Sequence, residues 1–371
     1  MNAPKLRFKE FNDGWQKKEL REISQIYDGT HQTPNYIQNG VPFVSVEDIS
    51  DIEKTNKFIS KNAFEKEFKI KPQVNDILMT RITAGIIGAT AIVKNNNPLG
   101  YYVSLALIRK NKEIDVNYLN QYINCFKFKK ELNKRIIHVA FPKKINLGDI
   151  GKCKISITSI NEQQKIGKML NILDRKIELQ SKKIEDLKLF KKGLLKKNYY
   201  KIANNNLTEL SCIANIYQPQ TISQSELDNG KYHVFGANGI IGKYSKFNHK
   251  FMQVTISCRG ENSGTINLTP DECWITGNSM VLNVDENKNV DKLYLKSILE
   301  AQNLKYLISG SGQPQIVRSS VLKHKIPYIS IEQQKKFTIP FIKLDSKIKL
   351  EQNKLIKLQK LKKGLMQRMF V

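Results

Sequence analysis

The feature that most constrains this chain is a helical segment that occurs twice. The tetrapeptide Glu-Gln-Gln-Lys stands at 162–165 and again at 332–335, which is 170 residues later. The dipeptide Leu-Asp stands at 173–174 and again at 344–345, which is 171 residues later, so we expect one inserted residue between the matching blocks. A repeat of about half the chain predicts two homologous halves.

Both copies of the segment carry apolar residues in a heptad pattern, which is typical of helices that pair along a seam. Polar residues interrupt the stripes at equivalent places, with Gln180 and Lys191 in one copy and Glu351 and Lys362 in the other. The alternative is two unrelated amphipathic helices, but the matching interruptions favour pairing. The expected helix-pairing residues are Leu170, Leu173, Ile177, Ile184, Leu187 and Leu194 in the first copy, and Phe341, Leu344, Ile348, Leu355, Leu358 and Leu365 in the second.

The remainder of the chain divides into two globular segments, each followed by one of these helices. Strand-like runs such as 103–108 and 254–257, with Asn- and Gly-rich turns between them, predict mixed α/β domains. The two segments echo each other weakly, and the run that ends in Arg81 parallels the run that ends in Arg259. We expect a first domain at 1–158, a helix at 159–198, a second domain at 199–329 and a C-terminal helix at 330–371.

The charge of the chain favours a polyanionic partner. It holds 61 Lys and Arg against 34 Asp and Glu, a formal net charge of +27. Lysines and arginines on phosphates release counterions, so nucleic acid is a better interpretation than a soluble basic protein with scattered lysines. The five cysteines form no paired motif, there is no apolar signal segment, and no run of residues is apolar enough to span a membrane, so we expect a cytoplasmic protein.

The order of these elements resembles the specificity subunit of type I restriction–modification systems. The resemblance covers essentially the whole chain and includes the opening Pro4–Trp15, the glycine-rich run Tyr232–Gly239 and the run Gly310–Gln315. It implies an α+β protein, in which two mixed α/β target recognition domains are separated by two long antiparallel coiled-coil helices in a pseudo-twofold repeat. Each domain would read one half of a bipartite DNA target, with a fixed gap set by the helices.

The resemblance also implies partners. Two modification (methyltransferase) subunits would bind this scaffold and methylate adenine, and restriction (translocase/endonuclease) subunits would cut DNA. S-adenosylmethionine, ATP and Mg²⁺ are then expected on those partners, and no cofactor in this chain. Alternatives from other classes are a stand-alone DNA methyltransferase or nuclease with built-in recognition domains, or a non-specific DNA-bridging protein.

Candidate DNA-binding residues are polar and aromatic side chains in loops between strand-like runs, where functional residues are usually found. In the first half they are Thr30, His31, Gln32, Arg81, Thr83, Tyr101, Tyr102, His138, Lys143 and Lys144. In the second half they are Gln218, Gln220, Asn238, Arg259, Asn262, Ser311, Gln313 and Gln315.

No catalytic or metal-binding site is expected. The chain lacks the Asn/Asp-Pro-Pro-aromatic tetrapeptide that an adenine methyltransferase uses to hold its base. Asp271, Glu286 and Lys288 match a loose nuclease pattern that is common by chance. The chain is therefore interpreted as a non-catalytic DNA-binding subunit.

Overall fold

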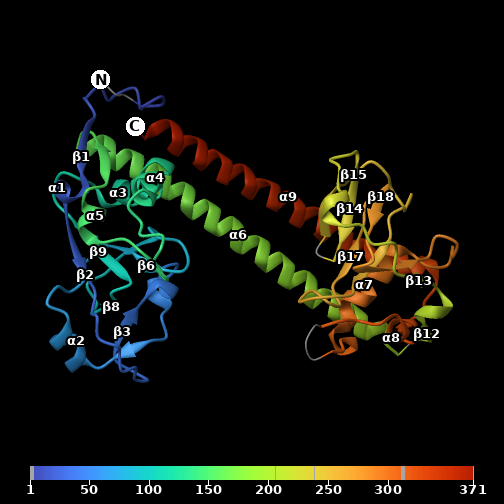
Figure 1. Ribbon diagram of the computed structural model, residues 1–371. Helices are drawn as coiled ribbons and strands as arrows, with labels where there is room; N and C mark the ends of the chain where they lie inside the picture. Colours follow the sequence, from blue (N-terminus) through green and yellow to red (C-terminus); the bar gives the residue numbers. More distant parts are fainter. Residues whose placement is uncertain (1–3, 205, 238, 311–313, 371) are drawn as a thin grey trace. The chain divides into compact units, whose positions relative to one another are not determined.

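The computed structural model describes residues 4–204, 206–237, 239–310 and 314–370 (Figure 1). The chain forms two compact units: unit 1 comprises Met1–Gln180 with Lys354–Val371, and unit 2 comprises Ser181–Asn353. Two long helices, α6 (Ile160–Ile202) and α9 (Ile331–Met369), each contribute residues to both units. The predicted α+β fold with two long helices is confirmed.

Unit 1 is built on a four-stranded antiparallel sheet in the order β2 (Ser24–Asp28), β9 (Leu105–Lys110), β5 (Ile77–Thr80), β7 (Thr90–Ile92). A smaller sheet has the order β4 (Phe58–Ile59), β3 (Val41–Val44), β8 (Gly100–Tyr101), with β3 and β8 parallel. Two further pairs are β1 (Gln16–Glu19) with β11 (Lys154–Ile157) and β6 (Ile82–Thr83) with β10 (Lys143–Lys144). The helices are α1 (Leu20–Ile23), α2 (Lys61–Glu67), α3 (Val116–Ile123), α4 (Phe126–Asn133) and α5 (Leu147–Gly151), with 3-10 turns at Val46–Asp48 and Ile52–Lys54.

Unit 2 repeats this topology. Its larger sheet has the order β13 (Asn215–Tyr217), β19 (Ser279–Asn283), β16 (Val254–Ser257), β17 (Ile266–Leu268), again antiparallel. Its smaller sheet has the order β15 (Gly239–Tyr244), β14 (Tyr232–Gly236), β18 (Cys273–Ile275), with β14 and β18 parallel. The pair β12 (Leu207–Glu209) with β20 (Lys325–Pro327) corresponds to β1 with β11. The helices are α7 (Lys292–Gln302) and α8 (Arg318–Leu322), with 3-10 turns at Leu210–Cys212, Gln224–Glu226 and Leu304–Leu307.

The larger sheet of unit 1 is buried on both faces, which explains why its central strands are continuously apolar. Side chains alternate between the two faces of a strand. Ile77 and Met79 belong to a core cluster shared with α3 and α6, whereas Leu78 belongs to the cluster that lies toward the smaller sheet. The sheet thus separates two cores and fixes the loops at its ends.

The start of each long helix is held by a buried glutamine. Gln163 accepts a hydrogen bond from the Asp115 backbone N–H at 3.0 Å and donates to the carbonyls of Glu113 and Thr158. Gln334 accepts from the Asp291 N–H at 2.8 Å and donates to the carbonyls of Asn289 and Ile329. Both side chains are completely buried.

Gln334 is therefore the equivalent of Gln163, 171 residues later, although the tetrapeptides align at 170. The expected inserted residue was wrong, because one register of 171 runs through both helices. Two adjacent glutamines made the sequence alignment ambiguous by one position, and only their hydrogen-bond partners resolve it.

The heptad residues lie on the protected side of both helices. All of the expected helix-pairing residues are buried or half-buried, whereas the positions beside them are mostly exposed. In unit 2, Lys183 pairs with Glu351 at 3.1 Å and Lys191 with Asp345 at 2.6 Å. The partner's position on α9 falls as the position on α6 rises, so the two helices are antiparallel. In unit 1 the C-terminal end of α9, at Met369 and Phe370, packs in the same core as the start of α6.

Candidate nucleic-acid interface

Four candidate residues of unit 1 gather where β6 pairs with β10. Thr83 lies opposite Lys143 and Ile82 opposite Lys144 in this short ladder. The N–H of Ile137 donates to the carbonyl of Lys144 at 2.7 Å, which closes a loop that carries His138. His138, Lys143 and Lys144 are exposed, and Thr83 is half-buried. This loop therefore presents two lysines and a histidine to solvent on a hydrogen-bonded base.

A second group of candidates surrounds Asp28 at the end of β2. The Asp28 carboxylate pairs with the His31 imidazole at 2.9 Å, and the Asp28 carbonyl accepts the Tyr101 hydroxyl at 2.9 Å. Thr30 donates its hydroxyl to Glu67 at 2.8 Å. His31 and Gln32 are exposed, but Thr30 is 7% exposed and Tyr101 is fully buried.

Thr30 and Tyr101 hold this loop from below, which differs from their expected role as DNA contacts. Burial raises the pKa of the Tyr101 phenol well above its usual range, so the hydroxyl stays protonated and remains a donor. Within the group, His31 and Gln32 are the side chains with surface available to DNA.

Arg81 and Arg259 are not equivalent residues, and the sequence parallel between them was wrong by one position. The N–H of Ile145 donates to the carbonyl of Arg81, and the N–H of Ile316 donates to the carbonyl of Cys258. Arg81 is thus the counterpart of Cys258. Since successive residues of an extended strand face opposite sides, this displacement turns Arg81 inward, where it is 9% exposed, and Arg259 outward.

Arg81 has a structural partner that accounts for its burial. Its guanidinium lies 3.5 Å from both the Asp28 carboxylate and the Val103 carbonyl. This corrects the expectation of a direct base contact, since a guanidinium in this position has little surface to offer. Arg81 instead supports the loop of His31 from the protein side.

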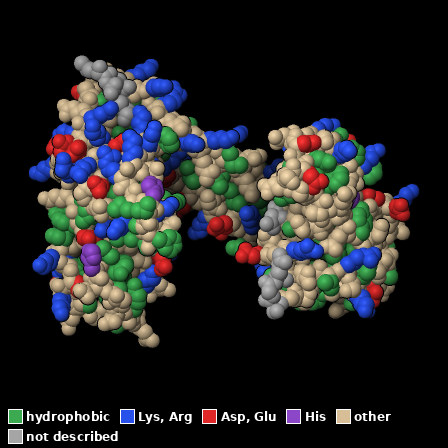
Figure 2. Space-filling view, in the orientation of Figure 1, with side chains coloured by type: hydrophobic (Ala, Val, Ile, Leu, Met, Phe, Trp, Pro, Cys, Tyr) green, Lys and Arg blue, Asp and Glu red, His purple; other side chains and the backbone are tan. Residues whose placement is uncertain are grey.

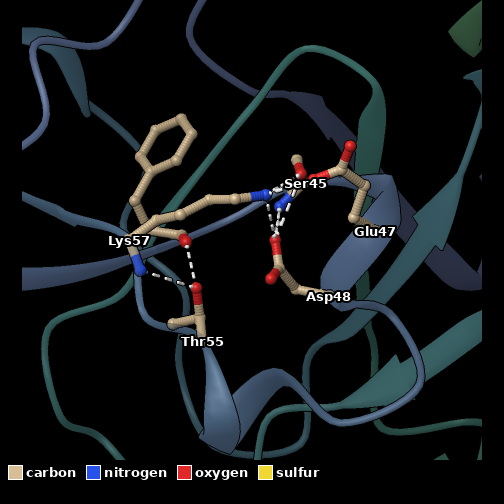
Figure 3. A network of polar contacts seen from close by, with 6 residues as sticks. Ser45, Glu47, Asp48, Thr55 and Lys57 are labelled. Atoms are coloured by element: carbon tan, nitrogen blue, oxygen red, sulfur yellow. Dashed lines mark hydrogen bonds and ion pairs between the residues drawn. The ribbon is translucent and has the colours of Figure 1, made fainter. Parts of the chain in front are cut away.

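Tyr102 lies on an edge that a polar network makes rigid (Figure 3). The Lys57 amine contacts the Glu47 carboxylate at 2.6 Å, the Ser45 hydroxyl at 3.2 Å and the Asp48 carboxylate at 3.3 Å. Burial disfavours the charged Lys57 amine, but its bonds to both carboxylates outweigh burial and raise its pKa. The network fixes the turn after β3, to which the Tyr102 backbone is bonded through the Val44 carbonyl at 3.0 Å. Tyr102 itself is half-buried against Phe43.

In unit 2 the candidates gather at the end of β16. Arg259 and Gln315 form a β-bridge, and the N–H of Gly260 donates to the carbonyl of Pro314 at 3.0 Å. Gln218 donates to the carbonyl of Gly277 at 3.1 Å and also contacts the Cys258 thiol, whose pKa burial raises to about 11. Gln218, Arg259 and Gln315 are exposed side by side.

The other candidates of unit 2 lie near this group or outside the described residues. Asn262 is exposed in the turn that follows Arg259, and Gln220 is exposed in the loop of Gln218. Asn238, Ser311 and Gln313 lie outside the residues that the structure describes.

A hollow of about 670 Å³ in unit 1 was missed by sequence reasoning. It lies between α4, the turn after β6 and the loop of His138, and its lining includes Ile86, Phe126, Lys129 and Lys130. Lys129 donates to the carbonyl of Gly88, and burial lowers its pKa to about 8. Alternating Phe and Lys in α4 was the available signal, but this pattern is also typical of an ordinary amphipathic helix.

Within the described ranges, no group of three or more His, Cys, Asp or Glu residues is arranged to hold a metal ion. Over the same part of the chain, no helix has both the length and the apolar character needed to cross a membrane.

Comparisons with known proteins agree on one family. The family model described as the type I restriction modification DNA specificity domain matches residues 12–189 and 204–360. The putative type I restriction enzyme MjaX specificity subunit of Methanocaldococcus jannaschii is 25% identical over 409 residues, covering 98% of this chain and 95% of that protein.

Solved structures share the fold. The S subunit of a type I restriction-modification system from M. genitalium superposes with a TM-score of 0.67 at 18% identity, covering 100% of this chain and 99% of the other. A structure from work on complex assembly and conformational transition of the type I R-M system superposes with a TM-score of 0.56 at 14% identity, covering 95% and 96% of the two chains.

Proposed function

This chain belongs to the family of type I restriction–modification specificity subunits, which recognise DNA and are not catalytic, and we propose that it reads a two-part DNA target with one part assigned to each unit. The observation that carries the proposal is the repetition of one topology with different exposed side chains at equivalent places. Lys144 in unit 1 corresponds to Gln315 in unit 2, and Ile82 corresponds to Arg259.

The chemistry of these side chains suggests that the two half-sites differ in sequence. Arginine pairs with guanine, and glutamine with adenine, through two hydrogen bonds in the major groove. Unit 2 presents Arg259 with Gln218 and Gln315, a set suited to reading base edges. Unit 1 presents His31, Gln32 and two lysines, a set that combines base contacts with phosphate binding.

The paired helices supply the second part of the proposal, which is a scaffold. Modification subunits would bind this chain and methylate adenine with S-adenosylmethionine, and restriction subunits would bind the assembly and use ATP and Mg²⁺. The chain itself would hold none of these cofactors. The net charge of +27 supports DNA as the other partner, because each phosphate contact releases a counterion.

The test is a genome-wide map of methylated adenines in a methylation-free host. The chain is co-expressed with its modification subunit, and the control omits the chain. We expect one motif of two short specified parts and an unread gap, and we expect it to disappear in the control. Methylation of the same motif without this chain would contradict the proposal.

A further inference from the structure

The loop between α4 and β10 in unit 1 carries the most exposed apolar side chains of the described residues. Val139 is 97% exposed and Phe141 is 94% exposed. Neither side chain contributes to a core cluster, so nothing in the fold of unit 1 requires them to be apolar. Isolated exposed apolar residues are ordinary, but two on one loop beside further exposed apolar residues mark a binding surface.

The loop is held in place at its base. The N–H of Ile137 donates to the carbonyl of Lys144 at 2.7 Å, and Lys143 pairs with Thr83 in the adjacent strand. Residues 138–142 therefore project from two hydrogen-bonded anchors. A projecting side chain on a fixed base loses less conformational entropy when it binds than one on a free segment.

The surroundings of the loop combine apolar surface with positive charge. His138 and Lys143 border the hollow that Ile86 and Phe126 line, and these two are 74% and 72% exposed. Lys129 and Lys130 complete its basic lining, and none of the residues that line it is a carboxylate. Figure 2 shows hydrophobic side chains beside lysine and arginine on the face of unit 1 that it presents.

These observations favour one occupant, double-stranded DNA. Apolar wedges of the Phe and Ile type enter between base steps and partly unstack them, while flanking cations hold the phosphates. We propose that Phe141 inserts between two base pairs of the half-site read by unit 1, with Lys143 and Lys144 on the adjacent backbone. This inference rests on the proposed function, and it adds the deformability of one base step to what unit 1 reads.

Unit 2 has no such wedge in its sequence. The register of 171 places Gly310, Ser311 and Gly312 opposite Val139, Ala140 and Phe141. The inference therefore predicts unstacking in one half-site and none in the other.

The experiment uses the full chain in complex with its modification subunit and a duplex that contains the methylated motif. The fluorescent base analogue 2-aminopurine, which brightens when it is unstacked, replaces single bases in turn, except the adenine that becomes methylated. We expect brightening at one step of one half-site. Phe141→Ala should abolish it and weaken binding about tenfold, the order expected when an aromatic ring stacked on a base is removed, and Phe141→Trp should retain it.

The matched control is Phe251→Ala in unit 2. Phe251 is also an exposed phenylalanine beside lysines, but it precedes β16, at the opposite end of that strand from Arg259. This control should change neither brightening nor affinity. Because Phe141 is almost fully exposed, its substitution should leave the thermal unfolding midpoint unchanged.

Three results would overturn the inference: no brightening with the unmodified complex, unchanged brightening with Phe141→Ala, or loss of the modification subunit from the Phe141→Ala complex, which would assign the loop to a protein contact. Failure of the proposed function is distinguishable, because the unmodified complex would then bind the motif no better than random duplex.

Discussion

At the scale of single residues, the repeated Glu-Gln-Gln-Lys motif has a structural role. Gln163 and Gln334 each satisfy one backbone N–H and two carbonyls at the point where a long helix begins. Buried backbone groups require such partners, since an unpaired one is costly. The motif recurs because both units dock a helix in the same way, and it carries no information about DNA.

Replacement of Gln334 by alanine should destabilise unit 2. It leaves the Asp291 N–H and two carbonyls without their partner, at a cost of about 1–3 kcal/mol per buried unsatisfied group. The free energy of unfolding in urea should fall by at least about 2 kcal/mol. The neighbouring Gln333→Ala is the control, because Gln333 is exposed and contacts only Ser330. Equal losses for the two variants would contradict the role assigned to Gln334.

The residue scale is also where sequence reasoning failed most often. The Arg81 and Arg259 parallel was displaced by one position, and in a strand one position is the difference between inside and outside. Tyr101 looked like a loop residue available to DNA, but it is buried in the smaller sheet. Local composition does not specify which face of a strand is covered, so these residues could not be placed from sequence alone.

At the scale of elements, the heptad pattern predicted the helices well. Apolar periodicity reports burial directly in a helix, and the expected seam residues are protected in the structure. The ion pairs follow the same repeat: Lys191 with Asp345 in unit 2 corresponds to Lys362 with Asp174 in unit 1. Surface ion pairs contribute little stability, about 0–1 kcal/mol, so we attribute to them the register of the helices rather than their strength.

Charges placed on the seam should separate the helices. Leu187→Lys with Leu358→Lys puts an ammonium at a half-buried position of each helix, and we expect a loss of about 2 kcal/mol per site, from the apolar burial given up. The measurement is the thermal unfolding midpoint of the isolated chain. Leu179→Lys with Leu350→Lys is the matched control, since these leucines are 57% and 55% exposed on outward positions. Comparable losses in both double variants would argue against a seam.

At the scale of the whole molecule, the account is one fold used twice with different surfaces. Strand order, the parallel pair in the smaller sheet and the glutamine at each helix start are repeated. The loops at the sheet ends differ, as Phe141 beside two lysines and Arg259 beside two glutamines illustrate. The sequence predicted this asymmetry between similar helices and diverged globular segments, because the helices are constrained along their whole length and loop tips are not.

The most direct test of this account is the methylated-adenine map of Arg259→Ala beside that of the unmodified chain. Arg259 belongs to unit 2, so its loss should relax one base position in one half-site, at a cost of about 1–3 kcal/mol, and leave the other half-site as it was. An equal loss of discrimination in both half-sites would contradict the assignment of one half-site to each unit.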